Sequence, residues 1–399
     1  MKKGWQKQWL TAVTVKITDG SHNPPKGVAE SDYLMLSSKN VFDDDLHYAD
    51  PRYLTAEQYQ QEDKRTGVVP DDVLLTIVGT IGRSAVVPTD APRITLQRSV
   101  AVIRPNRQFI EPRFLMYSFI ERCSELNEQA RGVAQKGIYL ESLRELELML
   151  PPLSEQQRLV GLLDEAFDGI ATAKANAEKN LQNARALFES HLQSVFTQRG
   201  PGWVEKRLDD VCTFSSGGTP SKSNSSYWSG KIPWISGRDM KSTRLSDSLL
   251  HISKSAVDES STRMAAAGTL LILVRGMGLA HGAQIAELIV PCAFNQDIRG
   301  IHAEPSLIPR YLLFALRDGI NSSATVLSNA AHGTLKIDSN ELYSVMIPVP
   351  PRECQQKIVE TIDALVEETQ RLARLYERKL ALLAALKKSL LHQAFSGTL

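Results

Sequence analysis

The chain has 399 residues, of which 42% are hydrophobic and 23% charged, and its 46 Lys and Arg residues against 45 Asp and Glu give a net charge of +1. These values are ordinary for globular protein and exclude a disordered or strongly basic chain, while the length favours two domains. The four cysteines show no CxxC and no Cys/His ligand spacing, which excludes a disulfide scaffold and a structural zinc site.

The first residues, MKKGWQKQWL, carry two lysines that no apolar stretch follows. The longest apolar run near the middle, TLLILV at 269–274, is too short to span a bilayer. We therefore expect a cytoplasmic protein with no signal peptide and no membrane contact.

In chain order, the sequence predicts a globular part, a long helix, a second globular part and a second long helix. Proline pairs at 151–152 and 350–351 end the globular parts, because proline is tolerated where a helix begins but not inside one. The predicted fold class is α+β, with short strands and helices mixed in each domain. The predicted boundaries are domain 1 at 1–152, a central helix at 153–199, domain 2 at 200–351 and a C-terminal helix at 352–399.

The two globular parts are copies of one another. GWQKQWLTAV begins at Gly4 and GWVEKRLDDV at Gly202, and a shift of 198 or 199 positions, with small slips, aligns further segments in the same order. Such an order predicts two homologous domains rather than a solenoid, whose repeats run roughly 20–50 residues. The aligned segments are VLLTIVGTIG with TLLILVRGMG, Gln97 with Gln296, EPRFLMYSF with IPRYLLFAL, and LMLPPLSEQQRLV with IPVPPRECQQKIV.

Both predicted helices carry an apolar seam. Apolar residues recur every three or four positions from Leu159 to Val195 and, on nearly the same frame, from Ile358 to Ala394. A spacing held this long is typical of a coiled coil. A helix of 40–45 residues is roughly 60–68 Å long, too long to bury its seam on one compact domain. We predict that the helices pair antiparallel and that an internal approximate two-fold axis relates the two domains.

Three motifs could indicate catalysis or ligand binding, and each has a simpler explanation. RGMGLAHG (275–282) has the spacing GxGxxxG rather than GxGxxG, which favours a tight turn between strands over a dinucleotide site. NPP (23–25) resembles part of the catalytic tetrapeptide of amino-methyltransferases but lacks the following aromatic residue, which favours a turn. The aspartates at 43–45 have no spaced ligand set, which favours a solvated loop. With no HExxH, GxSxG or Cys/His dyad, we expect no catalytic residue, metal or cofactor in this chain.

The loops of the two copies differ although their flanking segments match. They carry small polar and basic side chains of the kinds that contact base edges and phosphates, which makes them candidate DNA-binding residues. Ordinary surface loops remain the alternative at this point. The candidates are Ser21, His22, Lys39, Asn40 and Arg83 in the first copy, and Thr219, Ser221, Lys222, Arg238, Asp239, Lys241 and Arg275 in the second.

Several segments resemble the specificity subunit of Type I restriction–modification enzymes, over essentially the whole chain. They are SGGTPSKSNSSYWSGKIPWISGRDM, TDGSHNPP, the helix starts PPLSEQQ and PPRECQQ, and the terminal LLHQAFSGTL. Cys354 and Met149 depart from the residues more frequent in the family.

The resemblance implies a non-catalytic subunit whose two target-recognition domains each bind one half of a bipartite site in double-stranded DNA. The helices would set the spacer and dock two methyltransferase subunits, which carry S-adenosylmethionine, and restriction subunits would join through the complex. Extra apolar residues of the helices either form this docking face or thicken the core of the pair: Phe167, Leu187, Leu375 and Leu386. The alternative function is a coiled-coil scaffold with two protein-binding domains and no role on DNA.

Overall fold

The computed structural model describes residues 4–130, 136–276, 278–279, 282–322, 327–329 and 335–399, and the chain divides into two compact units. Unit 1 consists of Met1–Glu178 and Glu377–Leu399, and unit 2 of Lys179–Tyr376. The long helices α5 (Leu153–Thr197) and α10 (Arg352–Ser396) each contribute to both units. The domain boundaries predicted above stay a prediction, but both helices begin directly after the predicted proline pairs.

The domain of unit 1 combines a four-stranded sheet in the order β2-β10-β7-β8 with a three-stranded sheet in the order β6-β3-β9 and the small pairs β1-β11 and β4-β5. Successive residues of β10 alternate between two hydrophobic clusters, so the four-stranded sheet is buried on both faces. The bounds are β1 Gln6–Trp9, η1 Leu10–Ala12, β2 Thr14–Asp19, β3 Tyr33–Leu36, β4 Val41–Phe42, β5 Asp45–Leu46, β6 Arg52–Leu54, α1 Ala56–Thr66, β7 Val73–Thr76, β8 Ser84–Val86, β9 Arg93–Leu96, β10 Val100–Pro105, α2 Pro112–Glu121, α3 Cys123–Gln129, α4 Leu140–Arg144 and β11 Glu147–Leu150.

The domain of unit 2 has a five-stranded sheet in the order β13-β21-β18-β19-β15, a four-stranded sheet in the order β16-β14-β20-β17, and the pairs β12-β24 and β22-β23. The bounds are β12 Val204–Arg207, α6 Leu208–Val211, β13 Cys212–Ser216, η2 Ser225–Trp228, β14 Ile232–Ile235, β15 Arg244–Leu245, β16 Leu250–Ile252, α7 Lys254–Glu259, β17 Met264–Ala265, β18 Leu270–Leu273, β19 Ile285–Leu288, β20 Cys292–Phe294, β21 Ile298–Ala303, α8 Pro309–Ser322, β22 Leu327–Asn329, β23 Leu335–Ile337, α9 Ser339–Tyr343 and β24 Met346–Val349.

The internal repeat is present in the fold. The order β2-β10-β7-β8 of unit 1 reappears as β13-β21-β18-β19 in unit 2, and β6-β3-β9 reappears as β16-β14-β20. In both copies the middle strand of the second set pairs antiparallel on one side and parallel on the other. The long helices that follow have the same length, 45 residues each. The predicted fold class of two homologous mixed domains with two long helices is therefore confirmed.

Each long helix carries an equivalent buried glutamine in its first turn. Gln156 donates from Nε2 to the carbonyls of Phe109 and Pro151 at 2.9 and 3.0 Å, and its Oε1 accepts from the Glu111 amide at 2.9 Å. Gln355 makes the equivalent three hydrogen bonds in unit 2. Because a buried amide without partners costs about 1–3 kcal/mol, this residue fixes how the helix leaves its domain. It explains the first glutamine of each PPxxxQQ segment.

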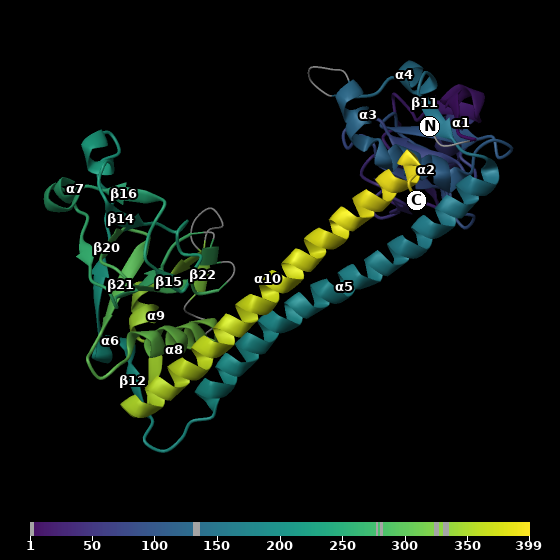
Figure 1. Ribbon diagram of the computed structural model, residues 1–399. Coiled ribbons are helices and arrows are strands. Elements are labelled where there is room, and N and C mark those ends of the chain that lie inside the picture. Colours follow the sequence, from purple (N-terminus) through teal and green to yellow (C-terminus); the bar gives the residue numbers. More distant parts are fainter. Residues whose placement is uncertain (1–3, 131–135, 277, 280–281, 323–326, 330–334) are drawn as a thin grey trace. The chain divides into compact units, whose positions relative to one another are not determined.

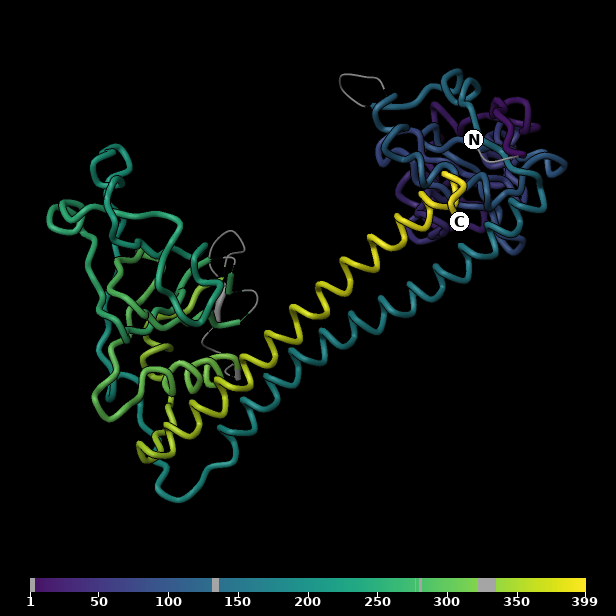
Figure 2. The backbone as a smooth tube through the Cα atoms, viewed as in Figure 1, coloured from purple at the N-terminus to yellow at the C-terminus, as the bar shows by residue number. Residues whose placement is uncertain are grey.

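The predicted seam is buried or half-buried along both helices. Within unit 1, the first part of α5 and the last part of α10 run antiparallel, since Arg158 donates to the Leu399 carbonyl at 3.2 Å and Lys387 lies 4.8 Å from the ring centroid of Phe167. Figures 1 and 2 show the end of α10, in yellow, reaching the domain of unit 1. Within unit 2, Phe188 of α5 and Ile362 of α10 belong to one hydrophobic cluster. The seam residues also join the domain cores, so each helix half packs against a domain as well as against the other helix.

A matched ion pair attaches each domain to its helix. In unit 1, Arg113 of α2 donates to Asp164 of α5 at 2.9 Å, and Tyr117 donates to the same carboxylate at 2.6 Å. In unit 2, Arg310 of α8 donates to Asp363 of α10 at 2.7 Å. Burial together with the neighbouring carboxylates raises the pKa of the Tyr117 hydroxyl, so this group stays a donor.

Two of the motifs set aside above lie between strands. The RGMGLAHG segment lies in the connection between the antiparallel strands β18 and β19, but this connection runs from Val274 to Gln284 and is longer than the predicted tight turn; Met277, Ala280 and His281 lie outside the described residues. NPP lies between β2 and β3, where Arg52 donates to the Pro25 carbonyl at 2.5 Å. Across the described residues, no helix is both long enough and apolar enough to cross a membrane.

Candidate nucleic-acid interface

A glycine brings one loop of each domain against a strand turn. A Cβ atom at Gly20 would lie 2.1 Å from the Leu96 carbonyl oxygen, and one at Gly217 would lie 2.3 Å from the carbonyl oxygens of Phe294 and Asn295. No side chain fits at such distances, so only glycine allows this approach. The next residue completes the contact in each copy, because the amides of Ser21 and Gly218 donate to Leu96 and Phe294 at 2.8 and 2.9 Å.

In unit 1 this glycine loop is organised around a buried carboxylate. Asp19 accepts a hydrogen bond from Arg65, and its Oδ2 lies 2.7 Å from Nε2 of His22. Ser21, one of the predicted DNA-binding residues, is buried and bridges to Gln97 through its backbone, so its side chain is withdrawn from the surface. The ring of His22 remains half exposed.

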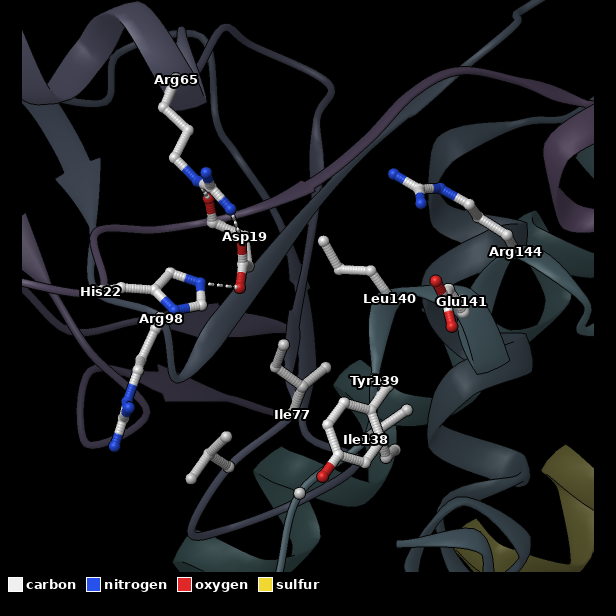
Figure 3. Close-up of a pocket in the computed structure, with 12 residues that line it drawn as sticks. Asp19, His22, Arg65, Ile77, Arg98, Ile138, Tyr139, Leu140, Glu141 and Arg144 are labelled. Carbon is white, nitrogen blue, oxygen red and sulfur yellow. Dashed lines mark hydrogen bonds and ion pairs between the residues drawn. The ribbon is translucent and has the colours of Figure 1, made fainter. Parts of the chain in front are cut away.

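A pocket of about 560 Å³ opens beside this loop in unit 1 (Figure 3). It is lined by both charge signs, with Asp19 and Glu141 among the acidic residues and three arginines from different elements around them. Figure 3 shows Arg65 and His22 converging on Asp19, whereas the side chain of Arg98 extends away from this group. Arg144 donates to the Ile17 carbonyl at 3.4 Å. The pocket therefore offers donors and acceptors together, as a surface that contacts base edges requires.

In unit 2 the corresponding loop is held by tryptophans. Trp234 donates from Nε1 to the Gly218 carbonyl at 3.0 Å and Trp228 to the Ser221 carbonyl at 3.1 Å, and the two rings pack edge to face at 5.1 Å. Thr219, a predicted site residue, donates to the Gln296 side-chain oxygen at 2.5 Å. The tryptophans explain the YW and IPWI segments: they hold the loop backbone while Ser221 and Lys222 stay exposed.

A second loop follows β3 in unit 1 and β14 in unit 2. Within it, neighbouring predicted DNA-binding residues differ in exposure. Asn40 is 1% exposed; its Oδ1 accepts from the Ser37 amide, and its Nδ2 donates to two carbonyls across the loop. Asp239 of unit 2 accepts likewise from the amides of Ser236 and Leu249. The prediction that Asn40 contacts DNA is therefore wrong, because its hydrogen-bonding capacity is used inside the loop.

The preceding residue of each loop faces solvent. Lys39 is exposed and pairs with Asp50 at 2.5 Å, and Arg238 of unit 2 is exposed. Exposed ion pairs contribute little to stability, about 0–1 kcal/mol, so Lys39 can exchange this partner for another anion. These positions therefore combine a hydrogen-bonded loop with an exposed basic side chain.

The remaining loop candidates are spread more widely. Arg83 lies with its guanidinium 4.9 Å from the ring centroid of Phe42, and Arg275 is an exposed residue whose backbone bridges to Lys336. Lys241 lines a separate pocket of about 340 Å³ beside the helices of unit 2. The structure does not bring these three residues together with the glycine loops into one surface lining.

Of the aspartates at 43–45, Asp43 and Asp44 form a turn and Asp45 begins β5. Asp44 has a left-handed backbone conformation and pairs with Arg113 at 2.7 Å, while burial raises the pKa of Asp43. Within the described ranges, no three His, Cys, Asp or Glu side chains gather in a way that could hold a metal ion.

The four helix residues predicted to bind partners fall into two classes. Phe167 is 8% exposed and packs edge to face on Tyr117 at 5.5 Å, so it belongs to the core of unit 1 and cannot present a docking surface there. Leu187, Leu375 and Leu386 are 61%, 52% and 46% exposed. Leu382 is also exposed.

Sequence reasoning missed Arg65 and Arg98. Arg65 comes from the last turn of α1, and only the fold brings it to Asp19. The predicted alignment of Gln97 with Gln296 is wrong by one residue: the amides of Gln97 and Asn295 donate to the equivalent carbonyls of Leu36 and Ile235, so Arg98 corresponds to Gln296.

Comparison with protein families gives two matches in this chain. The family model described as Type I restriction modification DNA specificity domain matches residues 32–182 and again residues 201–377. The matches together cover more than half of the chain and fall one in each copy of the repeat.

Similar individual proteins carry related names. The specificity subunit of the Type I restriction enzyme EcoR124I/EcoR124II of Escherichia coli is 31% identical over 212 residues, which are 53% of this chain and 52% of that one. The Type I restriction enzyme MjaIX specificity subunit of Methanocaldococcus jannaschii is 29% identical over 184 residues, 44% of this chain and 41% of that one. The chain thus spans about half the length of these relatives or less.

Two solved structures have a similar fold. One, described as the structural basis of complex assembly and conformational transition of the type I R-M system, is 20% identical with a TM-score of 0.78 and covers 99% of this chain and 98% of its own. The HsdS subunit of Thermoanaerobacter tengcongensis is 20% identical with a TM-score of 0.59 over 100% of this chain and 98% of its own. At this identity the likeness concerns the fold alone.

Proposed function

The chain belongs to the Type I restriction–modification DNA specificity family, and from this premise we propose that it binds a bipartite, asymmetric DNA sequence, with each domain contacting one half. The observation that carries the proposal is one backbone frame present twice with different side chains on its loops. His22 of unit 1 stands where unit 2 has Thr219, and the exposed Arg98 stands where unit 2 has Gln296. Two equal frames with different loop chemistry are suited to two different targets.

The low net charge fits a subunit that does not hold DNA alone. Binding by phosphate contacts usually requires an excess of basic residues, and the chain has a net charge of +1. We propose that partner subunits supply much of the phosphate contact. The specificity subunit itself is the non-catalytic member of such an enzyme.

The long helices would set the spacer between the half-sites and dock two methyltransferase subunits. The exposed apolar residues Leu187, Leu375 and Leu386 of the helices would contribute to that docking. Each methyltransferase would carry S-adenosylmethionine, and restriction subunits would join through the complex. The two helices leave their domains through equivalent hydrogen bonds. The two junctions would therefore offer equivalent surfaces to two identical partner subunits.

The decisive experiment is co-expression of the full chain with its methyltransferase, followed by sequencing of methylated adenines. We expect two short, different half-sites separated by a non-specific spacer, with centres about one helical turn or roughly 34 Å apart. A single contiguous site would contradict the proposal. If the complex also fails to shift duplex DNA, the scaffold without a DNA role is the better explanation.

The role of the helices is tested by removing seven residues from both at once. Deleting one heptad from each keeps the seam in register. The recognised spacer should shorten while both half-sites stay unchanged. An unchanged spacer would contradict the spacer role, and deletion from α5 alone, which breaks the seam register, serves as the control for misfolding.

A further inference from the structure

The turn between β9 and β10 of unit 1 presents a glutamine and an arginine on a fixed backbone. The Arg98 amide donates to the Ser21 carbonyl at 2.9 Å, and the Gln97 amide donates to the Leu36 carbonyl at 2.9 Å. Gly20 lies directly against this turn, since a Cβ there would meet the Gln97 backbone at 2.4 Å. The Arg98 side chain therefore projects from a rigid position, and Arg98 lines the pocket of Figure 3.

The other basic side chains of this pocket already have partners. Arg65 donates to the carboxylate of Asp19 as well as to its carbonyl, and Arg144 donates to the Ile17 carbonyl. No hydrogen bond or ion pair engages the Arg98 guanidinium within the part of the chain that the structure describes, and this side chain is exposed. Figure 3 shows it extending away from the Asp19 group.

The second copy has the same turn with an uncharged residue in the place of Arg98. The Asn295 amide donates to the Ile235 carbonyl as the Gln97 amide donates to the Leu36 carbonyl, so the next residue, Gln296, corresponds to Arg98. Thr219 holds the side-chain oxygen of Gln296. A guanidinium with no partner among the described residues thus projects at this place from unit 1, and a carboxamide with an internal partner occupies it in unit 2.

We propose that Arg98 is a specificity-determining residue that recognises a guanine in the half-site bound by unit 1. The inference rests on the proposed function. A guanidinium on a rigid turn can donate two parallel hydrogen bonds to O6 and N7 of guanine, which is the commonest base-specific contact of arginine. Its counterpart Gln296 cannot make this contact, because a carboxamide offers one donor group beside one acceptor, the pattern that matches adenine rather than guanine.

The test compares three variants of the full chain in complex with its methyltransferase: Arg98→Ala, Arg98→Lys and Arg107→Ala. Each complex is used to select its site from a pool of random duplexes. Its binding to single-base variants of the selected site is then measured. In Arg98→Ala, the preference for guanine over the other bases should fall by about 5- to 150-fold at one position of one half-site. This is the loss expected for one bidentate contact. Arg98→Lys keeps the charge but loses the two-pronged geometry, so it should lose the same discrimination. Arg107 is an exposed arginine paired with Asp71 and should change nothing.

The outcomes separate the inference from the proposed function. If the wild-type complex selects a bipartite site and Arg98→Ala selects the same site equally well, the inference fails alone. If Arg98→Ala weakens all duplexes evenly and lowers the salt slope by about 1, Arg98 contacts phosphate and the inference is overturned. A wild-type complex that selects no site overturns both.

Discussion

Corresponding strand positions of the two units hold different interactions. In unit 1, Arg104 of β10 makes a two-pronged ion pair with the fully buried Asp72, with both distances 2.8 Å. In unit 2, His302 corresponds to Arg104 and Thr269 corresponds to Asp72, because Ile301 pairs with Leu270 as Ile103 pairs with Val73. The hydroxyl oxygen of Thr269 lies 3.4 Å from Nδ1 of His302. The same two strand positions thus hold an ion pair in unit 1 and a neutral pair in unit 2. The repeat preserves strand pairing and glycine contacts, while the interactions between side chains are free to change.

The largest expected effect comes from breaking the ion pair of unit 1. Asp72→Ala should lower the free energy of unfolding of unit 1 by about 3–5 kcal/mol, because Arg104 loses its buried partner. Urea denaturation of the full chain, followed by far-UV circular dichroism, measures the change. Arg107→Ala removes an exposed pair and should stay within about 0.5 kcal/mol of wild type. Equal effects of the two substitutions would contradict the difference in burial.

A smaller loss is expected where both copies depend on glycine. Gly20→Ala places a methyl group against the Leu96 carbonyl and should cost about 1–3 kcal/mol, and the half-site of unit 1 should be lost first. Gly161→Ala in α5 is the matched control, since nothing lies within 4 Å of its Cβ and alanine favours helix by about 1 kcal/mol. Denaturation and selection from random duplexes measure both. A neutral Gly20→Ala variant would show that the loop can move.

The exposed loop residues should affect DNA rather than stability. Arg238→Ala, like Lys222→Ala, should reduce discrimination in the half-site of unit 2 by about 1–3 kcal/mol and leave the other half-site unchanged. Asp239→Ala should instead destabilise the loop, because its carboxylate holds Ser236 and Leu249. Binding to single-base variants, together with thermal unfolding, separates the two effects. An Arg238→Ala variant that weakens both half-sites equally would argue for a phosphate contact.

The smallest effect is a pH dependence of unit 2. Burial lowers the pKa of His302, so below about pH 6.5 the unfolded chain binds a proton that the folded chain does not. The stability of unit 2 should therefore fall as pH falls, by at most about 1.4 kcal/mol per pH unit.

Replacing Trp5 and Trp9 by phenylalanine leaves tryptophans only in unit 2, so fluorescence then follows that unit in urea between pH 8 and pH 5. His302→Gln should flatten the dependence. The same slope in the His302→Gln variant would assign it to another group.

Several parts of the structure could be predicted because they depend on local pattern. The seam from Leu159 to Val195, the proline pairs and the aligned segments each report on their own neighbourhood, and the helices and the repeated domain follow from them. The glycine loop was recognised as a candidate site from the same kind of signal. A spacing of three and four needs no knowledge of distant contacts.

The roles of single loop residues could not be predicted, because distant parts of the chain decide them. Asn40 and Lys39 are neighbours of similar polarity, yet only Asn40 faces the carbonyls of His47 and Ala49. Phe167 and Leu187 are both apolar residues of α5, but only Phe167 meets Tyr117. Such partners become visible once the fold is known.

The glycine loops have a consequence for how this protein can change over generations. Backbone groups hold them in place: the amides of Ser21 and Gly218 bind carbonyls, and the amide of Arg98 binds another. Replacing the outward side chain of Arg98 or Lys222 therefore leaves the hydrogen bonds that anchor each loop intact. A new binding preference can arise from one substitution while the domain stays folded, whereas mutation of the glycines should be removed by selection. Mutational tolerance and intolerance thus stand side by side within a few residues of the same loop.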